Sequence, residues 1–213
     1  MSLQVTVVDY GVGNLYSVTR ALESIGAEVQ LSSDPEKITR ARRLILPGVG
    51  AFADGMEGLR ERGLIEPIGS YANSGRPLLG ICLGMQMLAG CSEEYGLHQG
   101  LGLIAGKVRA VPSTTVDGSP QKIPNIGWRR LLPAADADWS RSALASTPQG
   151  TAVYLVHSFH FVPDDSAHVL AYCEYGGHRV TSAVGVGKTI GCQFHPEKSG
   201  AAGLEILSCF VRD

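Results

Sequence analysis

The chain has 213 residues, of which 44% are hydrophobic and 18% are charged, with a formal net charge of −2. This length suits a single α/β domain over residues 1–213, which can bury roughly 70% of the surface that the unfolded chain exposes. The near-neutral charge provides no long-range attraction to nucleic acid or to an anionic membrane.

The first half of the chain alternates short apolar runs with amphipathic ones. Helical spacing places Val18, Leu22 and Ile25 on one face, and Gly26 is expected to end that helix. Strands separated by helices imply right-handed crossovers and a mainly parallel sheet. The sequence predicts strands over residues 3–8, 29–31, 44–46 and 77–81, and helices over 15–25, 54–62, 65–73 and 83–89.

The second half is richer in strands. Strand-like runs cover 103–111, 152–156, 169–173, 180–184 and 189–194, and Gly176-Gly177 indicates a hairpin turn. Residues 133–150, rich in Ala, Asp, Ser and Pro, are expected to form a surface connection with little core. Ser199 is expected to cap a last helix ending at 212, with Leu204, Leu207 and Val211 facing inward. The predicted fold is α/β, with one mixed, mainly parallel central sheet flanked by helices.

The cysteines indicate free thiols in a reducing compartment. The five cysteines are Cys82, Cys91, Cys173, Cys192 and Cys209. Their number is odd, and no CxxC or Cys/His ligand spacing accompanies them, which argues against a disulfide framework and a zinc site. The opening Met1-Ser2-Leu3-Gln4 lacks the features of a signal peptide. No apolar run approaches the roughly 20 residues of a membrane span, so we expect a cytoplasmic protein with no metal or other cofactor.

A candidate nucleophile lies between the strand ending at 81 and the helix starting at 83. Gly80-Ile81-Cys82-Leu83-Gly84 is the thiol counterpart of the G-x-S-x-G turn, whose small residues allow close packing beneath a strained nucleophile. A helix N-terminus favours the thiolate of Cys82, and we expect the backbone N–H of Leu83 to be free to bind an oxyanion. The alternative is an ordinary core cysteine, which is our interpretation of the other four.

A thiol nucleophile needs a base, and His195 follows the last predicted strand. Glu197 can accept the second ring N–H of His195 and fix its tautomer. His157 and His160 are weaker candidates beside a strand. The glycine turn Gly48–Gly50 follows another strand, and its N–H groups can either complete an oxyanion site or simply close a tight loop.

Six motifs, in order along nearly the whole chain, resemble the class I glutamine amidotransferases. Within that class they are most similar to the glutaminase subunits of imidazole glycerol phosphate synthases, which serve histidine biosynthesis. The resemblance implies a flavodoxin-like three-layer fold. The motifs are Tyr10-Gly11-Val12-Gly13-Asn14-Leu15, Pro47-Gly48-Val49-Gly50, Gly80-Ile81-Cys82-Leu83-Gly84-Met85-Gln86, Pro124-Asn125-Ile126-Gly127-Trp128, Tyr154-Leu155-Val156-His157-Ser158-Phe159 and His195-Pro196-Glu197-Lys198-Ser199.

The resemblance implies a mechanism and its residues. Cys82 would attack the side-chain amide of glutamine, His195 would protonate the departing ammonia, and water would then cleave the thioester to give glutamate. The oxyanion would be held by the N–H of Leu83 and by one from Val49 or Gly50. Residues implied in glutamine binding are Gly50, Gln86, Ser158 and Phe159.

The resemblance also implies a partner, a (β/α)₈ cyclase subunit that forms a heterodimer with this chain and receives the ammonia. The chain would be the ammonia supplier only, and slow without its partner. Asn125 and Phe159-His160 depart from the histidine and tyrosines common in the family, which bears on interface detail. Positions implied to face the cyclase are Asn14, Trp128, His157 and Lys198, each of which also has an ordinary structural interpretation.

Three alternatives stay open at this point. The first is another class I glutaminase, serving anthranilate or pyridoxal phosphate synthesis, although the glycine-glycine-glutamate segment of the vitamin-type enzymes is missing from the sequence. The second is a cysteine peptidase or γ-glutamyl hydrolase on the same fold. The third is a non-catalytic binding subunit, against which the intact Cys82, His195 and Glu197 argue.

Overall fold

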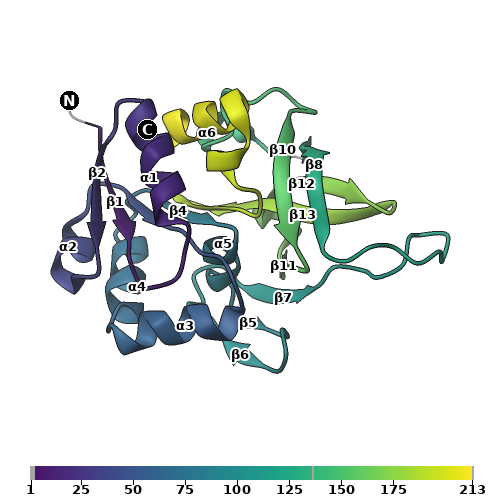
Figure 1. The fold of residues 1–213 in the computed structure, drawn as a ribbon, viewed down its shortest axis with the longest axis horizontal. Coiled ribbons are helices and arrows are strands. Elements are labelled where there is room, and N and C mark those ends of the chain that lie inside the picture. The colour runs from purple at the N-terminus through teal and green to yellow at the C-terminus, as the bar shows by residue number, and fades with distance from the viewer. Residues whose placement is uncertain (1–2, 136, 213) are drawn as a thin grey trace.

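The computed structural model describes residues 3–135 and 137–212. Met1, Ser2, Asp136 and Asp213 lie outside the described residues, and the first two belong to the opening segment that was expected not to be a signal peptide. A central sheet runs in the order β2-β1-β3-β4-β14-β13-β12-β9 (Figure 1). Its strands are β1 Gln4–Val8, β2 Glu28–Ser32, β3 Leu44–Leu46, β4 Leu78–Ile81, β9 Leu132–Pro133, β12 Val169–Tyr175, β13 His178–Val186 and β14 Thr189–Cys192.

The first five strands of that order pair in parallel and the remaining three pairings are antiparallel, so the predicted mixed, mainly parallel sheet is confirmed. Two small sheets stand beside it. One pairs β8 (Asn125–Arg130) with β10 (Ala152–His157), and the other contains β5 (Cys91–Ser92), β6 (His98–Gln99), β7 (Gly106–Ala110) and β11 (Phe159–Pro163).

Helices cover both faces of the central sheet. Apolar side chains of α1 (Leu15–Ser24) and α6 (Gly200–Arg212) pack into the core on one face. Those of α2 (Pro35–Arg40), α3 (Phe52–Glu61), α4 (Ile65–Asn73) and α5 (Leu83–Met87) form the core on the other. Figure 1 shows these two layers above and below the sheet. None of the described helices combines the length and the apolar character needed to cross a membrane.

The strand order explains how distant motifs meet. β4 lies between β3 and β14 and is parallel to both, with Leu46 beside Gly80 and Ile81 beside Cys192. Parallel neighbours end at the same edge of a sheet. The segments that follow β3, β4 and β14, which carry Gly48, Cys82 and His195, therefore leave the sheet side by side.

Several local predictions are confirmed. Gly176 and Gly177 both have positive φ, 58° and 79°, in the turn that joins β12 to β13. On α6, Leu207 and Val211 are buried and Leu204 is partly buried against the same core. Helix ends differ from expectation by a few residues: α1 ends at Ser24, α3 begins at Phe52, and α5 ends at Met87.

Two local predictions are wrong. Residues 133–150 do contribute to the core, because Trp139, Ala143 and Leu144 are buried and the Trp139 indole donates to the Leu170 carbonyl at 2.7 Å. The Ser199 hydroxyl does not cap α6. It donates to the His195 carbonyl at 2.7 Å and accepts the Tyr154 N–H at 3.0 Å, and so ties the segment after β14 to β10.

Candidate functional site

The turn after β4 holds Cys82 in a strained conformation. Its φ of 54° and ψ of −109° lie in a region that residues with a side chain rarely adopt. A Cβ on Gly80 would come within 2.7 Å of the Gly84 carbonyl oxygen, and one on Gly84 would overlap the Leu46 carbonyl. Both glycines of the motif are therefore required for α5 to pack against β3 and β4 directly beneath the thiol.

His195 lies beside this thiol, and Glu197 lies on the other side of its imidazole ring. The His195 backbone N–H donates to the Tyr154 carbonyl at 3.0 Å, and its Nδ1 lies 2.8 Å from Glu197 Oε1. Both side chains are buried, at 2% and 1% exposure. Burial alone would lower the pKa of His195, but the hydrogen bonds to Cys82 and Glu197, with their negative charges, outweigh it and raise the pKa to about 10. The arrangement therefore favours a protonated imidazole next to the sulfur.

The expected oxyanion donor is occupied. The Leu83 N–H donates to the Gly48 carbonyl at 3.3 Å, so the prediction that it is free is wrong for this conformation. The neighbouring peptide is also held, because the buried Tyr10 hydroxyl donates to the Pro47 carbonyl at 2.8 Å. The sequence did not predict the bond from Leu83 because its acceptor, Gly48, follows β3, whereas Leu83 follows β4. Gly50, with φ of 98°, follows at the rim of the site.

A cavity of about 300 Å³ opens over the thiol, within the size range of small-molecule sites. It brings together the expected catalytic pair, the glycine turn and the proposed glutamine-binding residues, whereas Glu197 lies behind His195. Its lining residues are Val49, Gly50, Cys82, Leu83, Gln86, Glu94, Pro124, Val156, His157, Ser158, Phe159 and His195.

Two polar residues of this region were missed by sequence reasoning. Glu94 lies in the loop after β5 and accepts the Phe52 N–H at 2.7 Å. Gln193 is fully buried after β14, and its amide nitrogen donates to Cys82 Sγ over 3.7 Å. Neither has a motif of its own: Glu94 is one acid in a polar loop, and Gln193 continues an apolar strand run.

The positions implied to face a partner differ in exposure. Trp128 is 53% exposed and packs edge-on against Tyr154, with ring centroids 6.1 Å apart. Lys198 is exposed, and Asn14 is half-buried and caps α1 by accepting the Ser17 N–H at 3.4 Å. His157 is instead buried at 6% exposure, so its imidazole is not on the free surface of this chain.

The buried His157 is held neutral by its surroundings. Its Nδ1 lies 2.9 Å from the Phe159 carbonyl oxygen, and its Nε2 lies 3.2 Å from the Asn125 amide nitrogen. Burial is the main cause that lowers the pKa of His157 to about 4, although the bond to Phe159 opposes the shift. A histidine that donates at Nδ1 presents Nε2 as an acceptor, which explains how Asn125 satisfies it.

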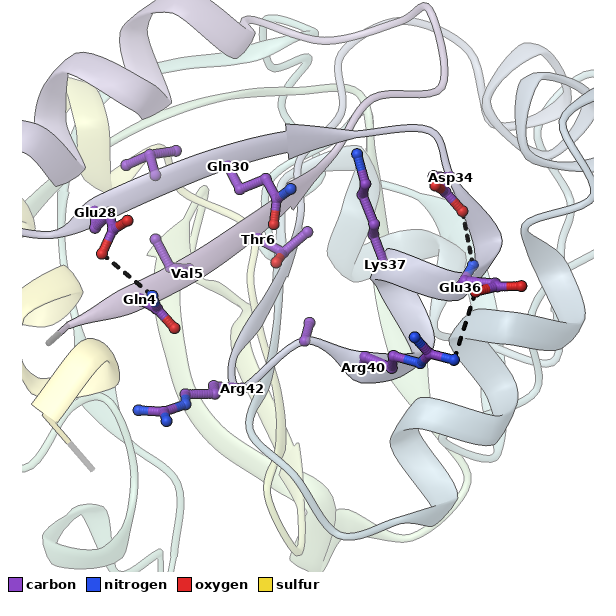
Figure 2. Close-up of a pocket in the computed structure, with 12 residues that line it drawn as sticks. Gln4, Val5, Thr6, Glu28, Gln30, Asp34, Glu36, Lys37, Arg40 and Arg42 are labelled. Atoms are coloured by element: carbon purple, nitrogen blue, oxygen red, sulfur yellow. Dashed lines mark hydrogen bonds and ion pairs between the residues drawn. The ribbon is translucent and has the colours of Figure 1, made fainter.

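A larger cavity, of about 670 Å³, lies away from this chemistry, between β1, β2 and α2 (Figure 2). Its lining mixes charges of both signs, with an exposed Arg40–Glu36 pair at 3.5 Å, and includes no histidine or cysteine. Across residues 3–135 and 137–212, no group of three or more His, Cys, Asp or Glu side chains is arranged to hold a metal ion. The cavity over Cys82 is therefore the candidate active site.

The chain is similar to known proteins over almost its whole length. The family model described as glutamine amidotransferase class-I matches residues 6–213. Imidazole glycerol phosphate synthase subunit HisH 1 of Legionella pneumophila (strain Lens) is 50% identical over 209 residues, which is 98% of each chain. Imidazole glycerol phosphate synthase subunit HisH of Geobacillus thermodenitrificans (strain NG80-2) is 49% identical over 96% of this chain and 93% of that relative. The structure of PurLQS from Thermotoga maritima, 20% identical, superposes with a TM-score of 0.74 over 100% of this chain and 98% of the other, which supports the fold.

Proposed function

Because the chain belongs to the class I glutamine amidotransferase family, we propose that Cys82, His195 and Glu197 form the triad with which it releases ammonia from glutamine. The observation that carries the proposal is a buried sulfur beside an imidazole whose pKa is raised to about 10, at the floor of a ligand-sized cavity. The match over residues 6–213 supports one glutaminase unit spanning the chain. Its five free thiols fit the reducing cytoplasm, where we place the protein.

In the proposed reaction the Cys82 thiolate attacks the side-chain amide carbon of glutamine. The His195 imidazolium gives its proton to the departing nitrogen, which leaves as ammonia. The now neutral imidazole takes a proton from water, which attacks the thioester, releases glutamate and restores the thiolate–imidazolium pair. Glu197, 2.8 Å from Nδ1, holds the ring so that Nε2 faces the sulfur.

The oxyanion requires a change from the conformation described above. Rotation of the Gly48–Val49 peptide would remove the carbonyl that now accepts the Leu83 N–H, and the same rotation would turn the Val49 N–H toward the site. Gly48, which precedes the rotating peptide, makes such a rotation sterically accessible. We therefore propose that Leu83 and an N–H of Val49 or Gly50 hold the oxyanion in the active state, and that the chain alone is slow.

Substrate recognition is proposed to use the walls of the same cavity. Glutamine carries an α-ammonium group, and Glu94 is the acidic side chain among the lining residues. Gly50 and the backbone of Ser158 and Phe159 offer hydrogen-bonding groups on other sides. Gln86 completes the set, with its amide nitrogen already bonded to the Phe159 carbonyl at 2.9 Å.

The printed names of the relatives describe subunits of imidazole glycerol phosphate synthase, which supports a partner subunit. We propose that this partner is the (β/α)₈ cyclase, which takes the ammonia within a heterodimer for histidine synthesis. Trp128, Lys198 and the loop at Asn14 are proposed to contact it. His157, which is buried, would act there only by supporting β8 through Asn125.

The decisive test uses Cys82→Ala with and without a histidine-pathway cyclase. We expect the variant to fold and bind the cyclase, to lose glutamine-dependent synthesis, and to leave ammonium-dependent synthesis intact. Normal glutamate release by the variant in the complex would refute the assignment of Cys82. Cleavage of γ-glutamyl peptides in preference to free glutamine would instead favour a peptidase-type relative.

A further inference from the structure

Gln193 is a buried amide to which the steps above give no role. It follows β14, two residues before His195, and its backbone N–H donates to the Ser182 carbonyl at 2.9 Å. Its side chain has 0% exposure and makes two bonds. Nε2 donates to Cys82 Sγ over 3.7 Å, and Oε1 accepts from Gln86 Nε2 at 3.0 Å. One amide thus joins the proposed nucleophile to the wall of the cavity.

The bond to sulfur distinguishes between the two protonation states of Cys82. A thiolate is a stronger acceptor than a thiol, so a fixed N–H donor stabilises the attacking form. The donor is also neutral and does not titrate. It therefore stays available through every protonation state of His195, including the step in which the tetrahedral intermediate formed by water expels the sulfur as a thiolate.

The bond to Gln86 fixes which end of that amide faces the cavity. The two N–H groups of Gln86 Nε2 have protein acceptors, the Phe159 carbonyl at 2.9 Å and Gln193 Oε1 at 3.0 Å. The remaining polar atom of Gln86 is its oxygen, which can only accept. A ligand that bonds to this oxygen must then be a hydrogen-bond donor, as the ammonium and amide groups of glutamine are.

We propose that Gln193 is a positioning residue for the glutaminase reaction, in which one buried amide both stabilises the Cys82 thiolate and orients Gln86 toward the substrate. The proposal rests on the function proposed above. It requires Gln193 to influence two separate quantities, the reactivity of the sulfur and the affinity for glutamine. A residue that only fills the core would change neither at constant fold.

The test measures the alkylation of Cys82 by iodoacetamide as a function of pH, followed by mass spectrometry of the Cys82 peptide. Gln193→Met keeps the volume but removes the donor and the acceptor. We expect its alkylation curve to move to higher pH by about one unit, which is roughly tenfold less thiolate at a pH below both midpoints. In complex with the cyclase, KM for glutamine should also rise and the acid limb of kcat/KM should move with the alkylation curve.

Two further variants keep the test decisive. Gln193→Asn retains an amide but withdraws it by one methylene, and it should shift the alkylation curve in the same direction. It replaces the Met variant in the test if that variant does not fold. Ser182→Ala removes a buried hydroxyl that donates to the Val180 carbonyl at 3.2 Å, beneath the same segment, and should leave both quantities unchanged. An unchanged curve and KM in a folded Gln193 variant, with an active wild type, would overturn the proposal. A wild-type complex that releases no glutamate would instead refute the proposed function.

Discussion

The carboxylate at 197 determines which state of His195 faces the sulfur. It is 1% exposed and lies 2.8 Å from Nδ1, and its charge helps to raise the pKa of His195 to about 10. Glu197→Gln keeps the size but removes the charge and the preference for one tautomer. We expect kcat in the complex to fall roughly a thousandfold, less than in Cys82→Ala. An equal loss in both variants, measured as glutamate release, would mean that Glu197 takes part in the chemistry itself.

His157 makes the fold sensitive to acid. Its pKa is about 4 in the folded chain, chiefly because of burial, against 6.5 as the ordinary value. Between these values the unfolded chain binds a proton that the folded chain does not. The contribution of neutral His157 to the free energy of unfolding is thus complete above pH 6.5. It falls by about 3 kcal/mol as the pH falls toward 4.

His157→Gln tests that linkage directly. Urea unfolding at several pH values between about 7 and about 4.5 should give a shallower loss of stability in the variant than in the wild type. A residual slope is expected from His160, because burial also lowers its pKa to about 4. Parallel slopes in the two proteins would contradict the assignment.

The junction of β4 with α5 leaves no room for even one added carbon atom at Gly84. A Cβ on Gly84 would overlap the Leu46 carbonyl of β3, whereas one on Gly69 of α4 would have nothing within 4 Å. Gly84→Ala should lower the free energy of unfolding by about 3 kcal/mol or more, because helix and strand must separate. Gly69→Ala, the control, should raise it by about 0.5–1 kcal/mol through helix propensity. Equal urea midpoints for the two variants would show that the close approach is unimportant.

Strands with one uninterrupted pattern were predictable, and strands whose pattern is broken were not. β1, β3, β4 and β14 read as apolar runs, and the helices between the first three predicted that these strands pair in parallel. β8 and β11 were missed because Gly127 breaks one alternating run and Ser158 divides another, where the chain passes between the two small sheets. α2 was missed because the helix has only six residues. Its start signal is nevertheless in the sequence: Pro35 begins the helix, and Asp34 accepts the Glu36 N–H at 2.9 Å.

The site was predictable to the extent that its residues carry motifs. Cys82, His195 and the Gly48–Gly50 turn could be brought together from strand ends alone, whereas the hydrogen bond of Leu83 N–H to Gly48 depends on the rotation of one peptide, which no local pattern specifies. Gln193 and Glu94 likewise act through contacts with residues distant in sequence.

At the scale of the whole molecule, the engaged Leu83 N–H and the exposed Trp128 lead to linked expectations. With its proposed oxyanion donor occupied, the isolated chain should release glutamate slowly, and adding the proposed cyclase partner with its ligand should raise kcat by roughly a hundredfold or more. That stimulation should require the surface around Trp128, which is 53% exposed at β8.

Trp128→Ala should weaken binding of the cyclase by about 2 kcal/mol, roughly thirtyfold in Kd, because large aromatic side chains dominate such contacts. The basal rate of the isolated chain should not change, since Trp128 does not line the cavity. Leu31→Ala is the matched control: Leu31 is 47% exposed but lies on β2, at the opposite end of the molecule from β8 in Figure 1. Titration calorimetry and glutamate release would measure both effects. Equal Kd values for the two variants would remove Trp128 from the proposed contact, whereas a loss of basal rate in Trp128→Ala would mean that β8 supports the active site in the free chain as well.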